Sequence, residues 1–226
     1  MSSRCFDFVN VPVTELTVKE TFRPSTVKEF SPTVAIFTSP FGADIVLEGG
    51  SPETYANSRV IAIGKHTASA LEGKFGSVIV PEDQSSLGVI SLLERLLVPE
   101  DRVVLFISSR SNGLIRRYLH DKGITALVEE LYQAEKLPAD DFKKAISDND
   151  CFGLIVTSSF EAEVIFSDML DYSEKQEILR KRRVFAIGRT TASTLHGLNI
   201  PVSEPVGKSD LPKLVEAIDE KYCASE

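Results

Sequence analysis

The sequence predicts an α/β protein composed of two similarly built domains. Short apolar runs with the composition of β-strands alternate with longer helical patterns, and one strand-turn-helix motif occurs twice. The runs are apolar at successive positions, which is typical of strands buried on both faces, so we expect mostly parallel sheets flanked by helices. The predicted strands are Val34–Thr38, Val60–Ile63, Ser77–Val80, Arg102–Ile107, Gly153–Thr157 and Val184–Ile187.

Helical patterns occupy the segments between these strands. Side-chain oxygens at Ser86, at Thr190 and at Ser209 or Asp210 suit N-caps, because they can accept hydrogen bonds from the first amides of a helix. The predicted helices are Thr67–Gly73, Ser86–Leu97, Asn112–Lys122, Glu161–Leu170, Thr190–Leu195 and Asp210–Lys221.

The internal repeat is the most informative feature of the chain. The motif that runs from Val60 through the first helical turns to Leu71 returns at Val184–Leu195, about 120 residues later. A strand that ends in Thr-Ser precedes each copy, at Thr38 and at Thr157. So long a period excludes a solenoid of short repeats and indicates two α/β domains.

Composition narrows the class of protein further. The 226 residues fit one large domain or two small ones, and the net charge of −8 argues against nucleic-acid binding through overall charge. With 42% hydrophobic and 26% charged residues, the chain has the composition of a soluble globular protein, without a recognisable membrane span or secretory signal. Cys5, Cys151 and Cys223 cannot all pair with one another and form no zinc pattern, which favours a reducing, cytoplasmic setting.

The repeated turns are candidate binding sites. They bring glycine and hydroxyl groups to the carboxyl edge of each predicted sheet, where open α/β sheets bind ligands, and basic side chains stand beside them. The candidate substrate-binding residues are Thr38, Ser39, Gly64, Lys65, Thr67, Arg110, Thr157, Ser158, Ser159, Gly188, Arg189, Thr190 and Thr191. A structural role stays equally open, because glycine also suits a turn and serine or threonine also caps a helix.

Several other chemistries do not match the spacing. The turn at Gly64 is neither a dinucleotide-binding nor a P-loop motif. His66, His120 and His196 lack the spacing of a metal site or a catalytic triad, so we expect no metal site. The basic pair at Arg116 is interpreted as a solvated helix face.

The motifs together support a family resemblance. The two turns read Ala62-Ile-Gly-Lys-His-Thr-Ala68 and Ala186-Ile-Gly-Arg-Thr-Thr-Ala192, and Phe37-Thr-Ser-Pro40 precedes the first. Two further segments take part in the comparison. They are Asp121–Gln133, which contains Tyr132, and Asn199–Val202 followed by Ser209–Ala217 near the C-terminus. In this order, from about Phe8 to Ile218, the chain resembles uroporphyrinogen-III synthases of tetrapyrrole biosynthesis.

The resemblance implies a fold of two α/β lobes, one inserted into the other. By analogy, Val11–Leu16 and Leu131–Ala134 would be linker strands joining the lobes, with a cleft between the lobes. The middle lobe would be residues 14–132, and residues 1–13 plus 133–226 would form the second, which lacks the family's first βα unit.

The resemblance also implies a reaction, the cofactor-free cyclisation of hydroxymethylbilane to uroporphyrinogen III with loss of water and inversion of ring D. Tyr132 matches the family tyrosine proposed as general acid, although an interdomain packing role is the alternative. The hydroxyl-bearing candidates would bind substrate acetates and propionates. The partner implied is a linear tetrapyrrole, bound by a cytoplasmic monomer in transient contact with hydroxymethylbilane synthase, without nucleic acid or membrane.

Three departures from the family pattern leave rival functions open. The early βα unit is missing, Glu161 follows the second Thr-Ser cluster, and Ser108-Ser-Arg-Ser111 replaces an arginine-glycine turn. Glu161 would either oppose a carboxylate-rich substrate or point away as a first-turn helix acid. A non-catalytic relative that binds a tetrapyrrole or another polyanion is therefore the alternative, and a small-ligand sensor is a third class.

Overall fold

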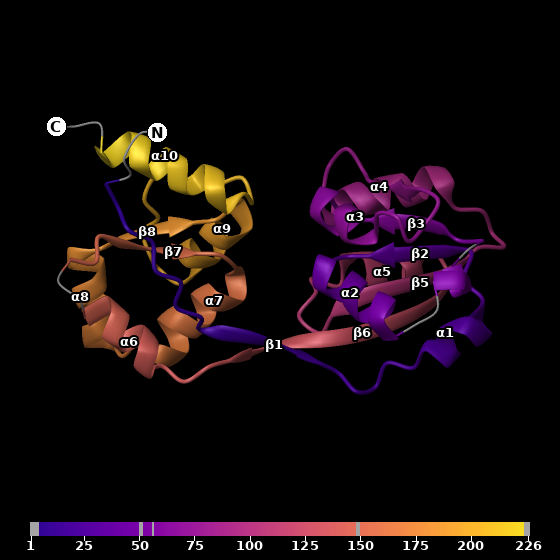
Figure 1. Ribbon diagram of the computed structural model, residues 1–226, viewed down its shortest axis with the longest axis horizontal. Helices are drawn as coiled ribbons and strands as arrows, with labels where there is room; N and C mark the ends of the chain where they lie inside the picture. Colours follow the sequence, from indigo (N-terminus) through magenta and orange to yellow (C-terminus); the bar gives the residue numbers. More distant parts are fainter. Residues whose placement is uncertain (1–4, 50–51, 56, 148–149, 224–226) are drawn as a thin grey trace. The chain divides into compact units, whose positions relative to one another are not determined.

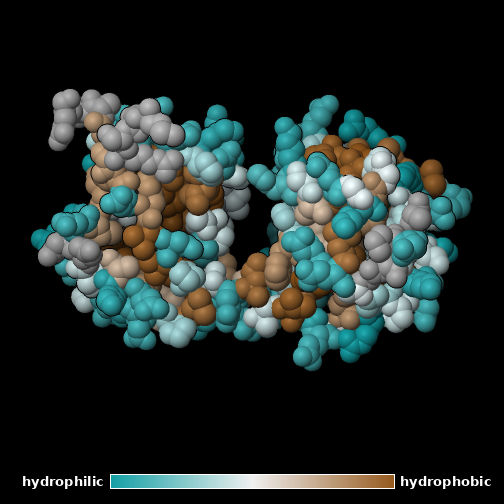
Figure 2. All heavy atoms as spheres, in the orientation of Figure 1, coloured by the Kyte–Doolittle hydropathy of each residue, from teal (hydrophilic) through white to brown (hydrophobic). Residues whose placement is uncertain are grey.

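A computed structural model describes residues 5–49, 52–55, 57–147 and 150–223 (Figure 1). The chain divides into two compact units. We call Leu16–Ala134 the middle unit, and the described residues of 1–15 and 135–226 the terminal unit. Hydrophilic side chains are spread over the visible surface of each unit (Figure 2).

The middle unit contains a six-stranded sheet in the order β1-β6-β5-β2-β3-β4, in which the first two residues of β1 and the last two of β6 belong to the terminal unit. The strand pairs β2–β3, β2–β5, β3–β4 and β5–β6 are parallel, as the apolar runs predicted. The strands are β1 (Thr14–Val18), β2 (Val34–Phe37), β3 (Arg59–Ala62), β4 (Val78–Ile79), β5 (Arg102–Ser108) and β6 (Thr125–Lys136).

Alternation along the central strands divides the core of this unit into two layers. In β2, Ala35 and Phe37 pack into one cluster with residues of α1, α2 and α3, whereas Val34 and Ile36 pack into another with residues of α4 and α5. Successive side chains of a strand point to opposite faces, so helices cover both faces of the sheet. The helices are α1 (Pro24–Phe30), α2 (Pro40–Gly49), α3 (Lys65–Leu71), α4 (Ser86–Leu96) and α5 (Leu114–Asp121), with a 3₁₀ turn, η1 (Pro52–Tyr55).

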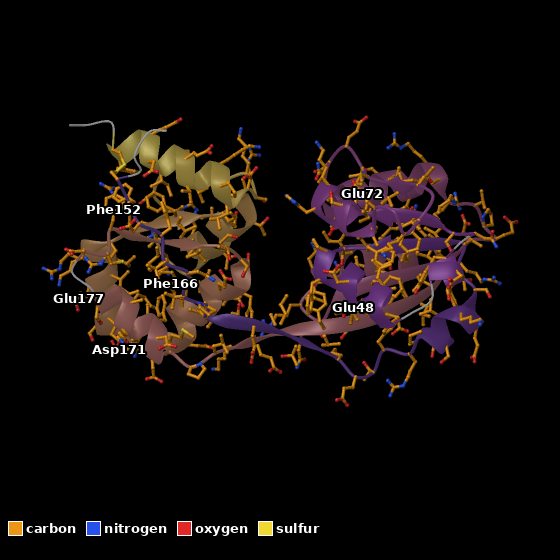
Figure 3. The ribbon with its side chains drawn as sticks, in the orientation of Figure 1. Glu48, Glu72, Phe152, Phe166, Asp171 and Glu177 are labelled. Atoms are coloured by element: carbon orange, nitrogen blue, oxygen red, sulfur yellow. A yellow bond between two sulfur atoms is a disulfide. The ribbon has the colours of Figure 1, made fainter. Side chains whose placement is uncertain are left out.

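The terminal unit has a smaller sheet, in which β7 (Gly153–Val156) pairs in parallel with β8 (Arg183–Ala186). Phe166 is fully buried in its larger core cluster, and Phe152 stacks on Phe6 beneath α10 (Figure 3). The helices are α6 (Asp140–Ser147), α7 (Ser159–Glu163), the π-helical η2 (Val164–Met169), α8 (Tyr172–Lys181), α9 (Arg189–Gly197) and α10 (Leu211–Cys223).

The two copies of the sequence repeat have the same strand register. Phe37 pairs with Ala62 at the end of β2–β3, and Val156 pairs with Ala186 at the end of β7–β8. The next amide donates to the neighbouring strand in both copies, Ile63 N to Phe37 O at 2.9 Å and Ile187 N to Val156 O at 3.0 Å. The repeat is therefore one local structure built twice.

Some predicted helix starts were wrong by one or two residues. Ser85, not Ser86, caps α4 by accepting from Gly88 N, and Gly188, not Thr190, precedes α9. At α10 the Asp210 carboxylate accepts from Lys213 N at 3.2 Å, which confirms that cap. The segment predicted as one helix from Glu161 is α7 followed by a π-helix.

The cysteines show an unexpected pairing. Cys5 and Cys223 form a disulfide across 218 residues of sequence, which ties α10 to the start of the chain, and Cys151 is a free thiol. Among the described residues, no helix has the length and apolar character needed to cross a membrane.

Candidate functional site

A cavity of about 200 Å³ lies at the carboxyl edge of the middle unit's sheet. Ends of parallel strands meet at this edge, as expected of an open α/β sheet. Thr38 follows β2, Ile63 follows β3, and Ser108 ends β5. The lining residues are Thr38, Ile63, Ser86, Leu105, Ile107, Ser108, Ser111, Asn112, Gly113, Ile115, Arg116 and Tyr132.

A β-bulge aims Tyr132 at this cavity. The register shifts so that Ile107 pairs with Glu130 but Ser108 pairs with Tyr132, which leaves Leu131 as the extra residue. Leu131 and Tyr132 consequently join the same buried cluster, although regular alternation would point them to opposite faces. Local strand geometry thus turns the tyrosine toward the strand ends.

The surroundings of Tyr132 fix its ring and leave its hydroxyl unengaged. The ring packs edge-on against Phe41 with centroids 5.0 Å apart, and the residue is 9% exposed. Its backbone carbonyl accepts from Ser109 N at 2.9 Å. Within the described part of the chain, the phenol has no hydrogen-bond partner. The packing role and an available proton donor therefore coexist at this residue.

The hydroxyls of the first Thr-Ser cluster have local partners. Thr38 Oγ1 donates to Phe106 O at 2.8 Å, which directs its proton into the sheet. Ser39 Oγ accepts from Gly42 N at 3.0 Å, so Ser39 caps α2 and can still donate its own proton to a ligand.

An ion-pair network holds a cation beside the cavity. Glu130 accepts from Arg116 at 2.6 Å and from Lys19 at 3.1 Å. These two hydrogen bonds lower the pKa of the Glu130 carboxyl to about 2, despite an opposing effect of burial. Because two cations share one carboxylate, the network carries a net positive charge, which suits an anionic ligand. The sequence analysis missed this role of Arg116.

We expect acid to break this ion-pair network by protonating Glu130. The folded pKa of Glu130, about 2, lies below its ordinary value of 4.5. The stability that it contributes is therefore fully present above about pH 4.5 and is lost as the pH falls toward 2. We expect Glu130→Gln to be about 1 kcal/mol less stable at pH 7 and the difference to shrink in this window, measured by urea unfolding at each pH. Parallel stability curves for the two proteins would contradict the assignment.

The first Gly-x-x-Thr turn is closed by a neighbouring side chain. Gln84 Oε1 accepts from Lys65 N at 2.9 Å, and a Cβ at Gly64 would come within 2.8 Å of that oxygen. Thr67 is buried at 2% exposure, while the Lys65 and Arg110 side chains are exposed. A side chain at position 64 would therefore have to displace the Gln84 amide from its hydrogen bond with Lys65 N.

The second set of candidates lies in the terminal unit. Ser158 Oγ accepts from Glu161 N at 3.0 Å and caps α7, and Thr194 Oγ1 donates to Ser159 Oγ at 2.9 Å. Gly188 precedes the first residue of α9, where Arg189 and Thr190 are exposed and Thr191 is buried at 4%. Thr157 is exposed, and both its amide and its hydroxyl donate to the Glu161 carboxylate.

The cavity thus brings together two of the predicted site residues, Thr38 and Tyr132. It adds polar residues that the sequence analysis did not select, among them Ser86, which exchanges hydrogen bonds with the Asn112 side chain. The available signal was the polar run that follows the long strand β5 directly, because such a run must lie at the sheet's carboxyl edge.

One group of metal-ligand atoms occurs among the described residues: Cys5, Asp219 and Cys223. The two sulfurs are bonded to each other in the disulfide, so neither is a thiolate that could bind a metal ion. We assign no metal site there.

Fold and cavity define an α/β protein with a cavity at the carboxyl edge of its larger sheet, lined by hydroxyl groups and Arg116. The family model described as Uroporphyrinogen-III synthase HemD matches residues 3–211. The chain belongs to the uroporphyrinogen-III synthase family. A search of curated protein sequences finds no match.

Solved structures show the same fold. Uroporphyrinogen-III synthetase from Helicobacter pylori is 19% identical, with 98% of this chain and 96% of that chain covered and a TM-score of 0.66. A mutant uroporphyrinogen III synthase from the extremely thermophilic bacterium Thermus thermophilus is 17% identical, with 95% and 88% covered and a TM-score of 0.64. The predicted family and the α/β fold with mainly parallel sheets are confirmed.

Proposed function

We propose that the protein is a uroporphyrinogen-III synthase, which converts hydroxymethylbilane to uroporphyrinogen III with loss of water and inversion of ring D. The observation that supports it most directly is the Tyr132 phenol, which lines a cavity at the sheet's carboxyl edge beside Arg116. The family match over residues 3–211 supplies the class of reaction.

The cavity suits part of such a substrate. Its volume of about 200 Å³ is below the range of about 300 to 1,000 Å³ typical of pockets that enclose a whole drug-sized ligand. It would hold one carboxylate-bearing arm, with the Arg116 guanidinium as the charged donor.

Tyr132 would act as general acid in this reaction. Its phenol would donate a proton to the departing hydroxyl of hydroxymethylbilane, so that the C–O bond breaks and water leaves. The pyrroles would stabilise the cation that forms, and the protein would hold the chain so that the less accessible carbon of the last ring attacks. The protein would work without a cofactor, as a cytoplasmic monomer that receives its substrate from hydroxymethylbilane synthase.

A product assay tests the proposal. The protein is incubated with freshly generated hydroxymethylbilane, and the oxidised uroporphyrin I and III isomers are separated. Uncatalysed closure gives the type I isomer, so we expect a type III excess over a control without protein. Type I product alone, from a sample whose folding is verified by circular dichroism, would refute turnover and favour the non-catalytic, tetrapyrrole-binding alternative.

A further inference from the structure

The two strand ends of the repeat differ at one equivalent position. Ser39 Oγ accepts from Gly42 N, and Ser158 Oγ accepts from Glu161 N, each at 3.0 Å. Gly42 and Glu161 therefore occupy equivalent positions, each three residues after the serine that caps its helix. The middle unit has no side chain at this position, whereas the terminal unit has a carboxylate.

The Glu161 carboxylate accepts hydrogen bonds from the donors at the end of β7. In the middle unit, Thr38 N and Oγ1 donate to the carbonyl of Phe106, at 3.3 and 2.8 Å. In the terminal unit, Thr157 N and Oγ1 donate to Glu161 Oε2, at 2.9 and 2.6 Å. The anion of Glu161 occupies the place that a strand carbonyl occupies in the other copy.

Sheet topology explains the substitution. Phe106 lies on β5, which pairs with β2 on the side away from β3. Within the described residues, β7 pairs with β8 alone, so no strand carbonyl is available on its other side. Glu161 supplies the acceptor that the topology does not, and its carboxylate forms a charge-assisted bond that is stronger than one to a neutral carbonyl.

We propose that Glu161 is an internal carboxylate that closes the strand end of the terminal unit to the carboxylates of the substrate, and so sets the affinity for it. This inference rests on the proposed function, because hydroxymethylbilane and its product carry many acetate and propionate groups. A substrate carboxylate at Thr157 must displace the Glu161 side chain and oppose its charge. Thr157 is exposed, so its two donors become accessible to solution once Glu161 is removed.

Two substitutions separate the charge of Glu161 from its occupancy of the donors. Glu161→Gln keeps an oxygen acceptor for Thr157 but removes the charge, and Glu161→Gly copies Gly42 and removes both. Glu163→Gln, on the same helix, is the charge-matched control. It removes one negative charge but leaves both hydrogen bonds from Thr157 to Glu161 in place. Binding of uroporphyrinogen III is measured under anaerobic conditions, after circular dichroism has shown that each variant folds.

We expect the Kd to fall about tenfold in Glu161→Gly and about threefold in Glu161→Gln, with the control within about twofold of wild type. In turnover, KM should fall with kcat largely kept. Equal Kd values for wild type and both Glu161 variants would overturn this inference alone, as would weaker binding by the folded Gln variant. No binding by any of the four chains would overturn the proposed function and this inference together. Binding by the variants but not by wild type would support the inference.

Discussion

Replacing Tyr132 by phenylalanine is expected to lower kcat for uroporphyrinogen III by about 10²-fold or more, with little change in thermal stability. The phenol oxygen has no hydrogen-bond partner within the described part of the chain, so its removal breaks no internal bond. The ring keeps its edge-on contact with Phe41, at 5.0 Å between centroids. The effect therefore falls on the proton that the residue supplies and not on the fold.

Tyr55→Phe is the matched control for this prediction. Tyr55 is a buried tyrosine of the same core cluster, at 3% exposure, and it does not line the cavity. The same atom is removed in both variants, so only Tyr132→Phe should slow formation of the type III isomer. If Tyr132→Phe turns over as fast as wild type while remaining folded, Tyr132 is not the acid and its role is packing alone.

The central strands that the sequence predicted, β2, β3 and β5, are those whose residues are buried on both faces of the sheet. The six predicted strands correspond to β2, β3, β4, β5, β7 and β8, because a short run of successive apolar residues is typical of a strand that is buried on both faces. By contrast α6 and α8 each bury a single residue, Phe142 and Ile178, and consist largely of charged and polar residues, so they contain no apolar run that marks them in the sequence. A capping box formed by Asp171 and Glu174 starts α8 and was a usable signal; Asp171 is labelled at that helix in Figure 3.

The candidate site could be predicted only in part, since its remaining features depend on contacts distant in sequence. A strand followed by Thr-Ser suffices to place Thr38 at a sheet edge. The role of Arg116 depends on Glu130, which lies on another element, and the predicted solvated face missed that partner. Likewise, the position of Glu161 follows from the topology around β7, which local sequence does not encode.

The largest expected loss of stability comes from the opposite edge of the middle sheet. Asp101 is 5% exposed, and its carboxylate accepts from Thr33 Oγ1 at 2.7 Å, from Val98 N at 2.8 Å and from Arg59. Burial alone would raise the pKa of Asp101, but these hydrogen bonds outweigh burial and hold the pKa below its ordinary value. The ionised carboxylate thus joins the starts of β3 and β5 to the segment before β2.

Asp101→Ala is expected to lower the free energy of unfolding by about 3 kcal/mol or more. The substitution removes the acceptor of three donors, namely the Thr33 hydroxyl, the Val98 amide and the charged Arg59 side chain. Urea unfolding at pH 7 measures this loss, and Asp44→Ala, at an exposed position of α2, should change stability by no more than about 0.5 kcal/mol. A loss below about 1 kcal/mol for Asp101→Ala would show that water replaces the carboxylate. Because Asp101 lies at the amino edge and Tyr132 lines a cavity at the carboxyl edge, the fraction of Asp101→Ala that remains folded should keep the KM of wild type. Stability would then depend on Asp101 at the amino edge of the sheet, and catalysis on Tyr132 at the carboxyl edge of the same sheet.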